Sequence, residues 1–402
     1  MFLVLIIYNI LIALGLFFFL TVFVKKSIDK VEGKKNKRFL IEILLMHTII
    51  GFFHYLFIFG KKVDANNYYN LPKGLNSWFS SFDTVYSTGV EFVYFLIYPF
   101  AKLEVAFYNV FLFFSILSLI GFYKLFFLFK ESFSKYNLNF NWMVYFLFLL
   151  PSFHFFITPI GKDVIIFFAL VSIFVNLKDK KIICFSNFIL LFSLLIIRPH
   201  IFIFLIVAYS LSVFFSSKTK AGYKLLIIII GLLILFLFAS HLKTSSGVDI
   251  FSSESIGNLF DRLNGYANRL SEDNSVLKDI KEKPFYVKML VFSFLPLFWK
   301  IENIMQLVIS FENLVLIIIF FKYLFSGKKL SFFKDKELYL KVIFLYAIIT
   351  WVLLGQTIYN LGLATRQKYM YIPFLYFIII LFLLEKKSLK KQSKSIKTLK
   401  KE

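Results

Sequence analysis

Long uninterrupted runs of apolar residues, rather than alternating apolar and polar positions, dominate this chain up to about residue 385. A helix that crosses the hydrocarbon core of a bilayer needs about 20 mainly apolar residues, and fewer where it is buried in a bundle. Backbone groups in lipid must satisfy their own hydrogen bonds, so runs this long indicate helices and not the short alternating strands of a barrel. The pattern predicts an all-α polytopic membrane protein.

The runs predict about eleven transmembrane helices in a single domain of residues 1–385. Two long loops, 60–103 and 242–302, interrupt this domain, and a basic tail, 386–402, follows it. The segment 90–101 is apolar but short and contains Pro99, which predicts a re-entrant or interfacial piece. The helices are expected near residues 2–24, 39–59, 104–129, 140–158, 164–177, 182–197, 201–216, 225–241, 303–325, 342–356 and 369–385.

The charge distribution predicts the topology. The net charge is +23, which in a soluble protein would suggest a nucleic-acid partner. In a membrane protein Lys and Arg collect in cytoplasmic loops, so we expect no nucleic acid here. The loops predicted to be cytoplasmic hold 30 of the 46 Lys and Arg residues. The N-terminus is therefore expected outside and the C-terminus inside, with the tail against anionic lipid.

Two features of composition narrow the picture further. The lone Cys184 excludes an intrachain disulfide framework. The first apolar run has no charged segment before it and no small-residue cleavage site, so we expect a retained first span. In the long loop 242–302, apolar residues from Ile256 to Leu270 recur at three- and four-residue steps, which predicts an amphipathic surface helix.

Arg198, Pro199 and His200 interrupt a stretch that is too long for one span. This predicts the outer tip of a hairpin, in which Arg198 ends one helix and Pro199 starts the next. A guanidinium offers a planar fork that fits pairs of phosphate oxygens. Ionisable groups at membrane depth are costly and usually mark a pathway or site. Arg198, with His200 beside it, is thus a candidate anion-binding group; the alternative is an Arg that snorkels at a helix end.

Two further outer tips carry cations. At the first tip, Lys162 and Asp163 follow Gly161, and the amides that open the next helix would favour an anion. The alternative is a Lys162–Asp163 surface pair. The second of these tips is a candidate part of the site and holds Asn360, Arg366, Gln367 and Lys368. The alternative is a polar loop with positive flanks. Positive residues at three outer tips run against the general preference of Lys and Arg for the cytoplasmic side, so we expect the three tips to meet in one polar site.

The first long loop supplies carboxylates and aromatic residues. Asp64 lies just beyond a span and is followed by Tyr68 and Tyr69. A carboxylate near phosphate-holding cations suits general-base work on a hydroxyl. Tyrosines suit sugars, through stacking and hydrogen bonds. The alternative for Asp64 is a helix cap. Glu312, at membrane depth, is expected to pair with an outer cation or to form a buried structural pair.

Several chemistries have no motif in the sequence. No HxxxH or HExxH spacing is present, so we expect no metal site. No phosphate-binding loop and no dinucleotide fingerprint occurs, so we expect neither a cofactor nor a nucleotide-driven pump.

The motifs form an ordered series along the chain. An early D-x-x-x-Y-Y is followed by GKD, then RPH, then N-x-G-x-x-x-R-x-K leading into PFL. This series resembles bacterial polysaccharide polymerases of the Wzy and EpsG type, which make O-antigen, capsule and exopolysaccharide. The resemblance covers most of the chain, although each motif alone is short. Loop 242–302 departs from the pattern, because Arg262 and Arg269 do not align with the arginine-rich repeat of some Wzy proteins.

The resemblance implies a multi-pass inverting glycosyltransferase in the bacterial inner membrane with a GT-C-like helical bundle. Such an enzyme joins oligosaccharide repeat units carried on undecaprenyl diphosphate at the outer face, and a chain-length regulator is an expected partner. The implied catalytic residues are Asp64 as base and Arg198 and Arg366 on the diphosphate. The implied substrate-binding residues are Lys162, Asp163, His200, Tyr68, Tyr69, Asn360 and Gln367.

Two alternatives stay open at this point. A GT-C type glycosyltransferase that moves one sugar from a polyprenyl phosphate would also carry an early outer carboxylate, which Asp64 would fit. A transporter or flippase of lipid-linked oligosaccharide would show inverted repeats and helices broken at mid-membrane.

Overall fold

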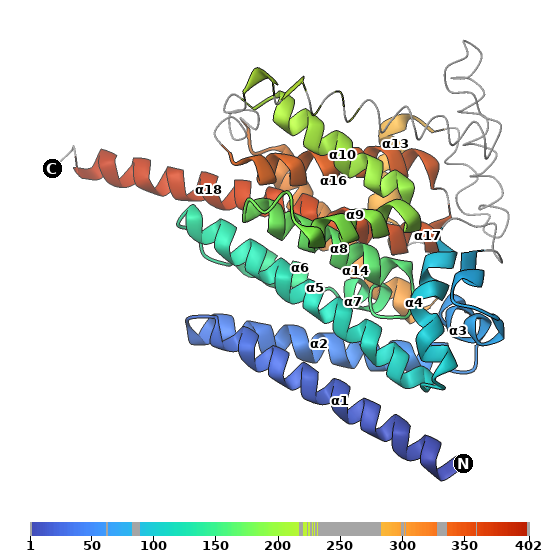
Figure 1. Cartoon of the computed structure of the whole chain (residues 1–402). Helices are drawn as coiled ribbons and strands as arrows, with labels where there is room; N and C mark the ends of the chain where they lie inside the picture. The colour runs from blue at the N-terminus through green and yellow to red at the C-terminus, as the bar shows by residue number, and fades with distance from the viewer. Residues whose placement is uncertain are drawn as a thin grey trace. The chain divides into compact units, whose positions relative to one another are not determined.

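The computed structural model describes most of the chain as helix (Figure 1). The described residues are 2–61, 63–82, 89–216, 220–222, 224–225, 227, 229, 231, 283–298, 301, 303–327, 336–358 and 360–399. Within them all regular structure is helical, as the sequence predicts. The helix predicted within loop 242–302 and most of the span predicted at 225–241 lie outside the described residues. The chain forms two compact units, Met1–Pro199 and His200–Glu402, each described by itself.

Unit 1 is built around one long helix, α5 (Phe107–Lys135). Phenylalanines such as Phe122, Phe126 and Phe129 are fully buried along it. Apolar burial on several sides makes α5 the centre of the unit. The helices α1 (Phe2–Asp29), α2 (Lys34–Ile58) and α8 (Lys162–Lys178) pack on α5. The short helices α6 (Trp142–Phe148) and α7 (Pro151–Phe156) also contact α5, through Phe148 and Phe153, and α9 (Phe185–Ile197) packs on α8.

Unit 2 follows directly after Pro199, which opens α10 (Pro199–Phe214). Packed helix pairs in this unit include α13 with α16 and α16 with α18. The tail predicted at 386–402 continues α18 as helix to Leu399. The described elements are α13 (Phe285–Phe294), α14 (Ile304–Leu324), α16 (Leu338–Thr357), α17 (Leu361–Gln367), the 3₁₀ turn η4 (Lys368–Met370) and α18 (Ile372–Leu399).

Among the described residues, five helices are long and apolar enough to cross a membrane: α1, α2, α5, α14 and α16. A sixth candidate is the pair Leu361–Met370 and Ile372–Leu389, which is bent by 54°. These six match six of the eleven predicted spans. Several long apolar helices are typical of a multi-pass membrane protein.

The remaining predicted spans in the described region form shorter helices. The span predicted at 140–158 is divided into α6 and α7, because Leu149 and Leu150 leave helical geometry and Pro151 starts a new helix. α8, α9 and α10 have 17, 13 and 16 residues. α8 is buried along most of its length, and a helix enclosed by others can cross a core with fewer residues.

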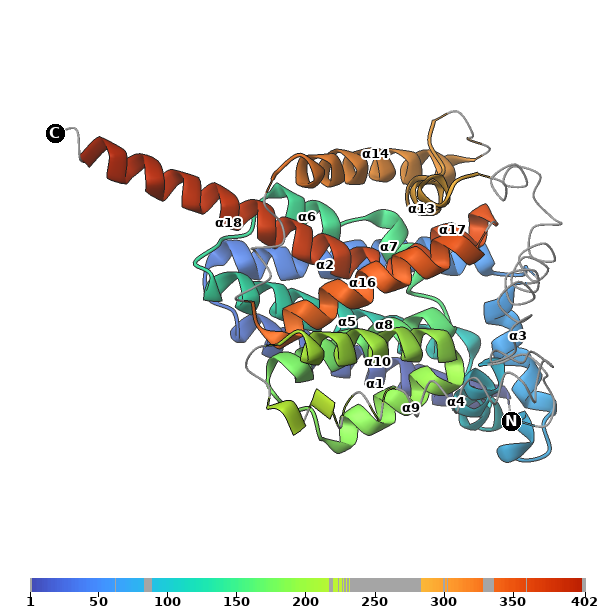
Figure 2. The same cartoon turned by 90° about the horizontal axis from the view of Figure 1, so that it is seen from above.

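The two ends of unit 1 differ in character. At one end α1 begins, α2 ends and α5 begins, and the chain there forms α3 (Asp64–Asn70), η1 (Leu71–Gly74), η2 (Phe79–Phe82) and α4 (Val90–Lys102) (Figures 1 and 2). We call this the loop end; it also holds the α7–α8 and α9–α10 connections. The opposite end carries the lysine-rich segments 25–38, 130–135 and 178–181, where Lys178 pairs with Glu131. We call it the basic end.

Candidate functional site

Arg198 and Asp163 form a buried ion pair at the loop end of unit 1. Arg198 Nη2 lies 3.0 Å from Asp163 Oδ1, and the two side chains are 10% and 6% exposed. Arg198 ends α9, with its amide donating to Leu194 O at 2.9 Å, and Pro199 opens α10. Both helix boundaries are as the sequence predicts. Removing one partner of such a pair leaves an uncompensated buried charge.

Lys162 and Asp163 are the first two residues of α8, which begins where the GKD motif predicts. Gly161 precedes them as the helix cap. A carboxylate in the first turn suits the positive end of the helix dipole. Lys162 is half-exposed beside the buried Asp163, so the first turn of α8 presents one cation toward the surface and one carboxylate toward Arg198.

Gly89 joins the α3–α4 segment to this ion pair. Its φ is +86°, and a Cβ added there would lie 2.1 Å from Ile197 O. Only glycine combines a left-handed conformation with this approach. The start of α4 therefore packs on the last residue of α9, immediately before Arg198. Two of the predicted outer tips and the first long loop thus meet in unit 1.

The carboxylates of Asp64 and Glu91 both influence the pKa of Tyr94. Asp64 is the exposed first residue of α3, and Glu91 lies in the first turn of α4. Burial raises the pKa of Tyr94, and the negative charges of Asp64 and Glu91 raise it further. Tyr68, which is buried, packs edge-on against Tyr94 with ring centroids 6.0 Å apart. Asp64 thus lies at the surface, near enough to the buried Tyr68–Tyr94 pair for its charge to act on Tyr94.

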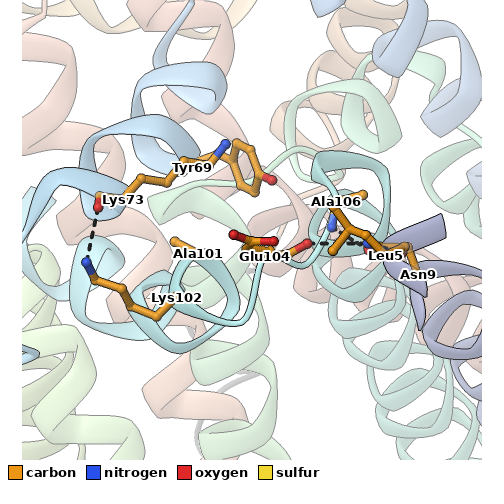
Figure 3. Close-up of a pocket in the computed structure, with 8 residues that line it drawn as sticks. All are labelled: Leu5, Asn9, Tyr69, Lys73, Ala101, Lys102, Glu104 and Ala106. Carbon is orange, nitrogen blue, oxygen red and sulfur yellow. Dashed lines mark hydrogen bonds between the residues drawn. The ribbon is translucent and has the colours of Figure 1, made fainter. Parts of the chain in front are cut away.

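A cavity of about 640 Å³ lies beside α3, between the start of α1 and the α4–α5 connection (Figure 3). Its lining is Leu5, Asn9, Tyr69, Lys73, Ala101, Lys102, Glu104 and Ala106. Tyr69 donates its hydroxyl to Val105 O at 2.7 Å and packs against Phe107. Burial raises the pKa of Tyr69, and Glu104 raises it further, so the hydroxyl remains a donor at neutral pH. Of the predicted site residues, only Tyr69 lines this cavity.

The third predicted tip belongs to unit 2. Asn360 caps α17, where its Oδ1 accepts from Leu363 N at 3.0 Å. Arg366 is half-exposed and Gln367 is buried in the last turn of α17. His200, in the first turn of α10, is half-exposed with its ring centroid 5.8 Å from that of Phe204.

A buried polar cluster in unit 2 differs from the sequence-based expectation for Lys368. This lysine is 0% exposed and donates to Asn313 Oδ1 at 2.6 Å, although we expected it at an outer tip. Tyr369 donates to Glu312 Oε2 at 3.4 Å. Glu312, which is 4% exposed, thus lies in one buried polar group with Asn313, Lys368 and Tyr369. The polar pair Glu312–Asn313 inside an apolar run was the signal for such a cluster.

A second buried group missed by the sequence analysis lies in unit 1. His47 Nδ1 and His154 Nδ1 are 3.1 Å apart, and His154 Nε2 lies 2.8 Å from Phe148 O. His47 is on α2 and His154 is on α7, so the pair joins two helices that pack together. Within the described part of the chain, no three His, Cys, Asp or Glu side chains are grouped so that they could hold a metal ion.

Comparison of the chain with family models, with curated proteins and with solved structures gives no match.

Proposed function

We propose that this chain is a multi-pass glycosyltransferase of the bacterial cytoplasmic membrane. In this proposal it joins glycan repeat units carried on undecaprenyl diphosphate at the outer face of the membrane. The observation that carries the proposal is the buried Arg198–Asp163 pair, set where two apolar helices turn and next to the α3–α4 segment. Burial of a charge where two apolar helices join is energetically costly, and such groups usually mark a functional site.

The proposed orientation places the loop end outside and the basic end in the cytoplasm. Lysine-rich segments concentrate at the basic end, which is the distribution that the positive-inside rule favours. Within unit 1, α1, α2 and α5 run alternately between the two ends, consistent with an N-terminus outside. The full proposal retains eleven spans, of which α6–α7, α8, α9 and α10 supply the short ones.

The chemistry of the proposal needs no nucleotide. A hydroxyl oxygen of the acceptor sugar attacks the anomeric carbon of the donor, a new C–O bond forms, and the bond to the diphosphate breaks. The polyprenyl diphosphate leaves with the electron pair, and the hydroxyl proton passes to a carboxylate, for which Asp64 is the candidate. Arg198 stabilises the charge that grows on the diphosphate, because its guanidinium can bond two oxygens at once.

Asp163 then has a positioning role. The hydrogen bond from Arg198 Nη2 to Asp163 Oδ1 restrains the guanidinium before the substrate arrives. Lys162 adds a second cation at the same helix start. Arg366 is proposed to contribute to diphosphate binding from α17, with Asn360 and Gln367 on the same short helix segment. Tyr68, Tyr69 and His200 remain proposed contacts for the sugars.

The test is the variant Arg198→Lys in a host strain that depends on this chain for its surface polysaccharide. The substitution keeps the positive charge but removes the planar guanidinium that can bond two oxygens at once. We therefore expect the ladder of polymer lengths on a gel to fall at least tenfold in intensity. Immunoblotting of the membrane fraction checks insertion. The matched control is Arg38→Lys, at a largely exposed arginine that pairs with Glu42 at the basic end; this variant should leave the ladder intact.

A wild-type ladder in Arg198→Lys would remove Arg198 from the mechanism. A product extended by one sugar, instead of a ladder, in a reconstituted reaction of the wild-type chain would favour the single-sugar transferase.

A further inference from the structure

We propose that the cavity lined by Asn9, Tyr69, Lys73, Lys102 and Glu104 binds the headgroup of an amine-bearing phospholipid, of the phosphatidylethanolamine kind (Figure 3). This inference goes beyond the proposed glycosyl transfer and does not depend on it. It rests on the charges in the cavity, on the backbone at Glu104 and on the apolar surface around the opening.

The first observation is that the cavity holds both signs of charge, on Lys73, Lys102 and Glu104. The Lys73 ammonium lies 4.0 Å from the centre of the Tyr69 ring and 3.4 Å from Asn70 Oδ1. Lys102 Nζ donates to the backbone oxygen of Lys73 at 3.1 Å. Within the described residues, neither lysine nor Glu104 makes an ion pair. Burial lowers the pKa of Lys73 and the charge of Glu104 raises it, so the two groups interact across the cavity without a direct contact, and a ligand between them could contact both.

The second observation is the conformation of Glu104. Its φ is +54°, in the left-handed region where a helix commonly ends on glycine. The bond from Val105 N to Phe100 O, at 2.9 Å, closes the end of α4 in the manner of a Schellman motif. A residue with a Cβ is less stable than glycine in this conformation. Within the described residues, the Glu104 carboxylate makes no hydrogen bond that would offset this cost.

The third observation concerns the surroundings. Leu5 and Asn9 place the first turns of α1 in the cavity wall, while Leu3, Val4 and Leu11 on the same helix are exposed. Leu103, which lies in sequence between the lining residues Lys102 and Glu104, is 62% exposed. A ligand head in this cavity would thus have uncovered apolar surface beside it, which suits the chains of a lipid.

The charges select the headgroup. A phosphodiester would bind the two lysines, and an ammonium would bind Glu104. A purely anionic headgroup would meet repulsion from the carboxylate, and a neutral sugar would leave all three charges unpaired. A phosphate ester with a primary amine satisfies both signs at once, so the geometry favours the zwitterionic lipid.

The experiment measures lipids retained by the purified full-length chain in detergent that contains equal amounts of phosphatidylethanolamine and phosphatidylglycerol. Native mass spectrometry counts the lipids bound per chain. We expect the wild type to retain phosphatidylethanolamine about tenfold more than phosphatidylglycerol. Glu104→Gln should bring the two close to equal, and Glu104→Lys should reverse the preference. Lys73→Met with Lys102→Met should lower retention of both lipids.

The matched control is Lys61→Met, an exposed lysine in the same loop that lies outside the cavity and contacts Phe57. It should keep the wild-type preference. Equal retention of the two lipids by the wild type, or an unchanged preference in both Glu104 variants, would overturn the proposal. Soluble glycerophosphoethanolamine that displaces the lipid at the lipid's own concentration would overturn it too, because the site would then serve the free headgroup. Polymer formation is measured separately, so failure here leaves the glycosyltransferase proposal untouched.

Discussion

At the scale of single residues, Gly89 allows the start of α4 to pack closely against the end of α9 at the loop end of unit 1. The left-handed backbone and the contact with Ile197 O exclude any side chain there. Because this contact lies immediately before Arg198, the conformation of one glycine fixes the approach of α4 to the candidate site. Gly74 in η1 provides a comparison, since an added Cβ meets nothing within 4 Å.

Gly89→Ala is therefore expected to destabilise the chain by more than about 2 kcal/mol, from left-handed strain together with the clash. Gly74→Ala should change the free energy of unfolding by less than about 1 kcal/mol. Thermal unfolding in detergent, followed by tryptophan fluorescence, measures both variants. Equal unfolding temperatures for Gly89→Ala and the wild type would contradict the close approach of α4 to α9.

Sequence reasoning at this scale succeeded where the cause is local. Gly161 and Pro199 mark where α8 and α10 begin, and each acts through its own backbone. The partnership of Arg198 with Asp163 could not be predicted, because it joins two helices far apart in sequence. The inward direction of Lys368 was missed for a related reason: whether a lysine near a helix break faces solvent or Asn313 depends on tertiary packing.

At the scale of elements, the attachment of α1 to unit 1 rests on few contacts. Its most apolar window is only 6% buried. Asn9 is the main polar link: its Oδ1 accepts from Ala106 N at 2.6 Å, and its Nδ2 donates to Glu104 O at 3.3 Å. Asn109 Nδ2 in turn donates to Asn9 O at 2.9 Å. One asparagine thus ties α1 to the start of α5.

Asn9→Leu should loosen the first half of α1 and cost about 1–3 kcal/mol, because Ala106 N loses its acceptor and Glu104 O loses its donor, whereas Asn109 keeps its bond to the backbone oxygen of residue 9. Hydrogen exchange measured by mass spectrometry should show faster exchange in residues 2–12 and 104–110. Thr21→Val serves as control, since the Thr21 hydroxyl donates to Phe17 O of its own helix. Unchanged exchange in Asn9→Leu would mean that lipid, and not the asparagine, holds α1 in place.

Hydropathy predicted the long helices well, since α1, α2, α5, α14 and α16 each occupy a predicted span. It was less informative for the short ones. The break between α6 and α7 arises at Leu149 and Pro151, inside a run that is apolar throughout. Periodicity within such a run does not distinguish one helix from two, because every face is apolar.

At the scale of the whole molecule, the proposed orientation makes a direct prediction about access from outside the cell. Asn70, at the loop end, and Asn139, at the basic end, are both exposed. The single Cys184 can be replaced by Ser to give a cysteine-free background. In intact cells, a membrane-impermeant maleimide should label Asn70→Cys and should leave Asn139→Cys unlabelled until the membrane is opened. The opposite pattern would invert the topology and remove the outer-face site.

The shortness of α9 has a consequence for the bilayer itself. Thirteen residues of α-helix rise only about 20 Å, against about 30 Å of hydrocarbon in a typical bilayer. Phe185, Phe188 and Phe192 are exposed on this helix, so acyl chains would contact it directly. If α9 crosses the membrane as proposed, the lipid beside it would thin to match its length, and phosphate groups would lie deeper, toward the level of Arg198. In the proposed function, the diphosphate of a polyprenyl-linked donor could then reach the Arg198 guanidinium where the leaflet is thinned, while its polyprenyl chain stays in the membrane.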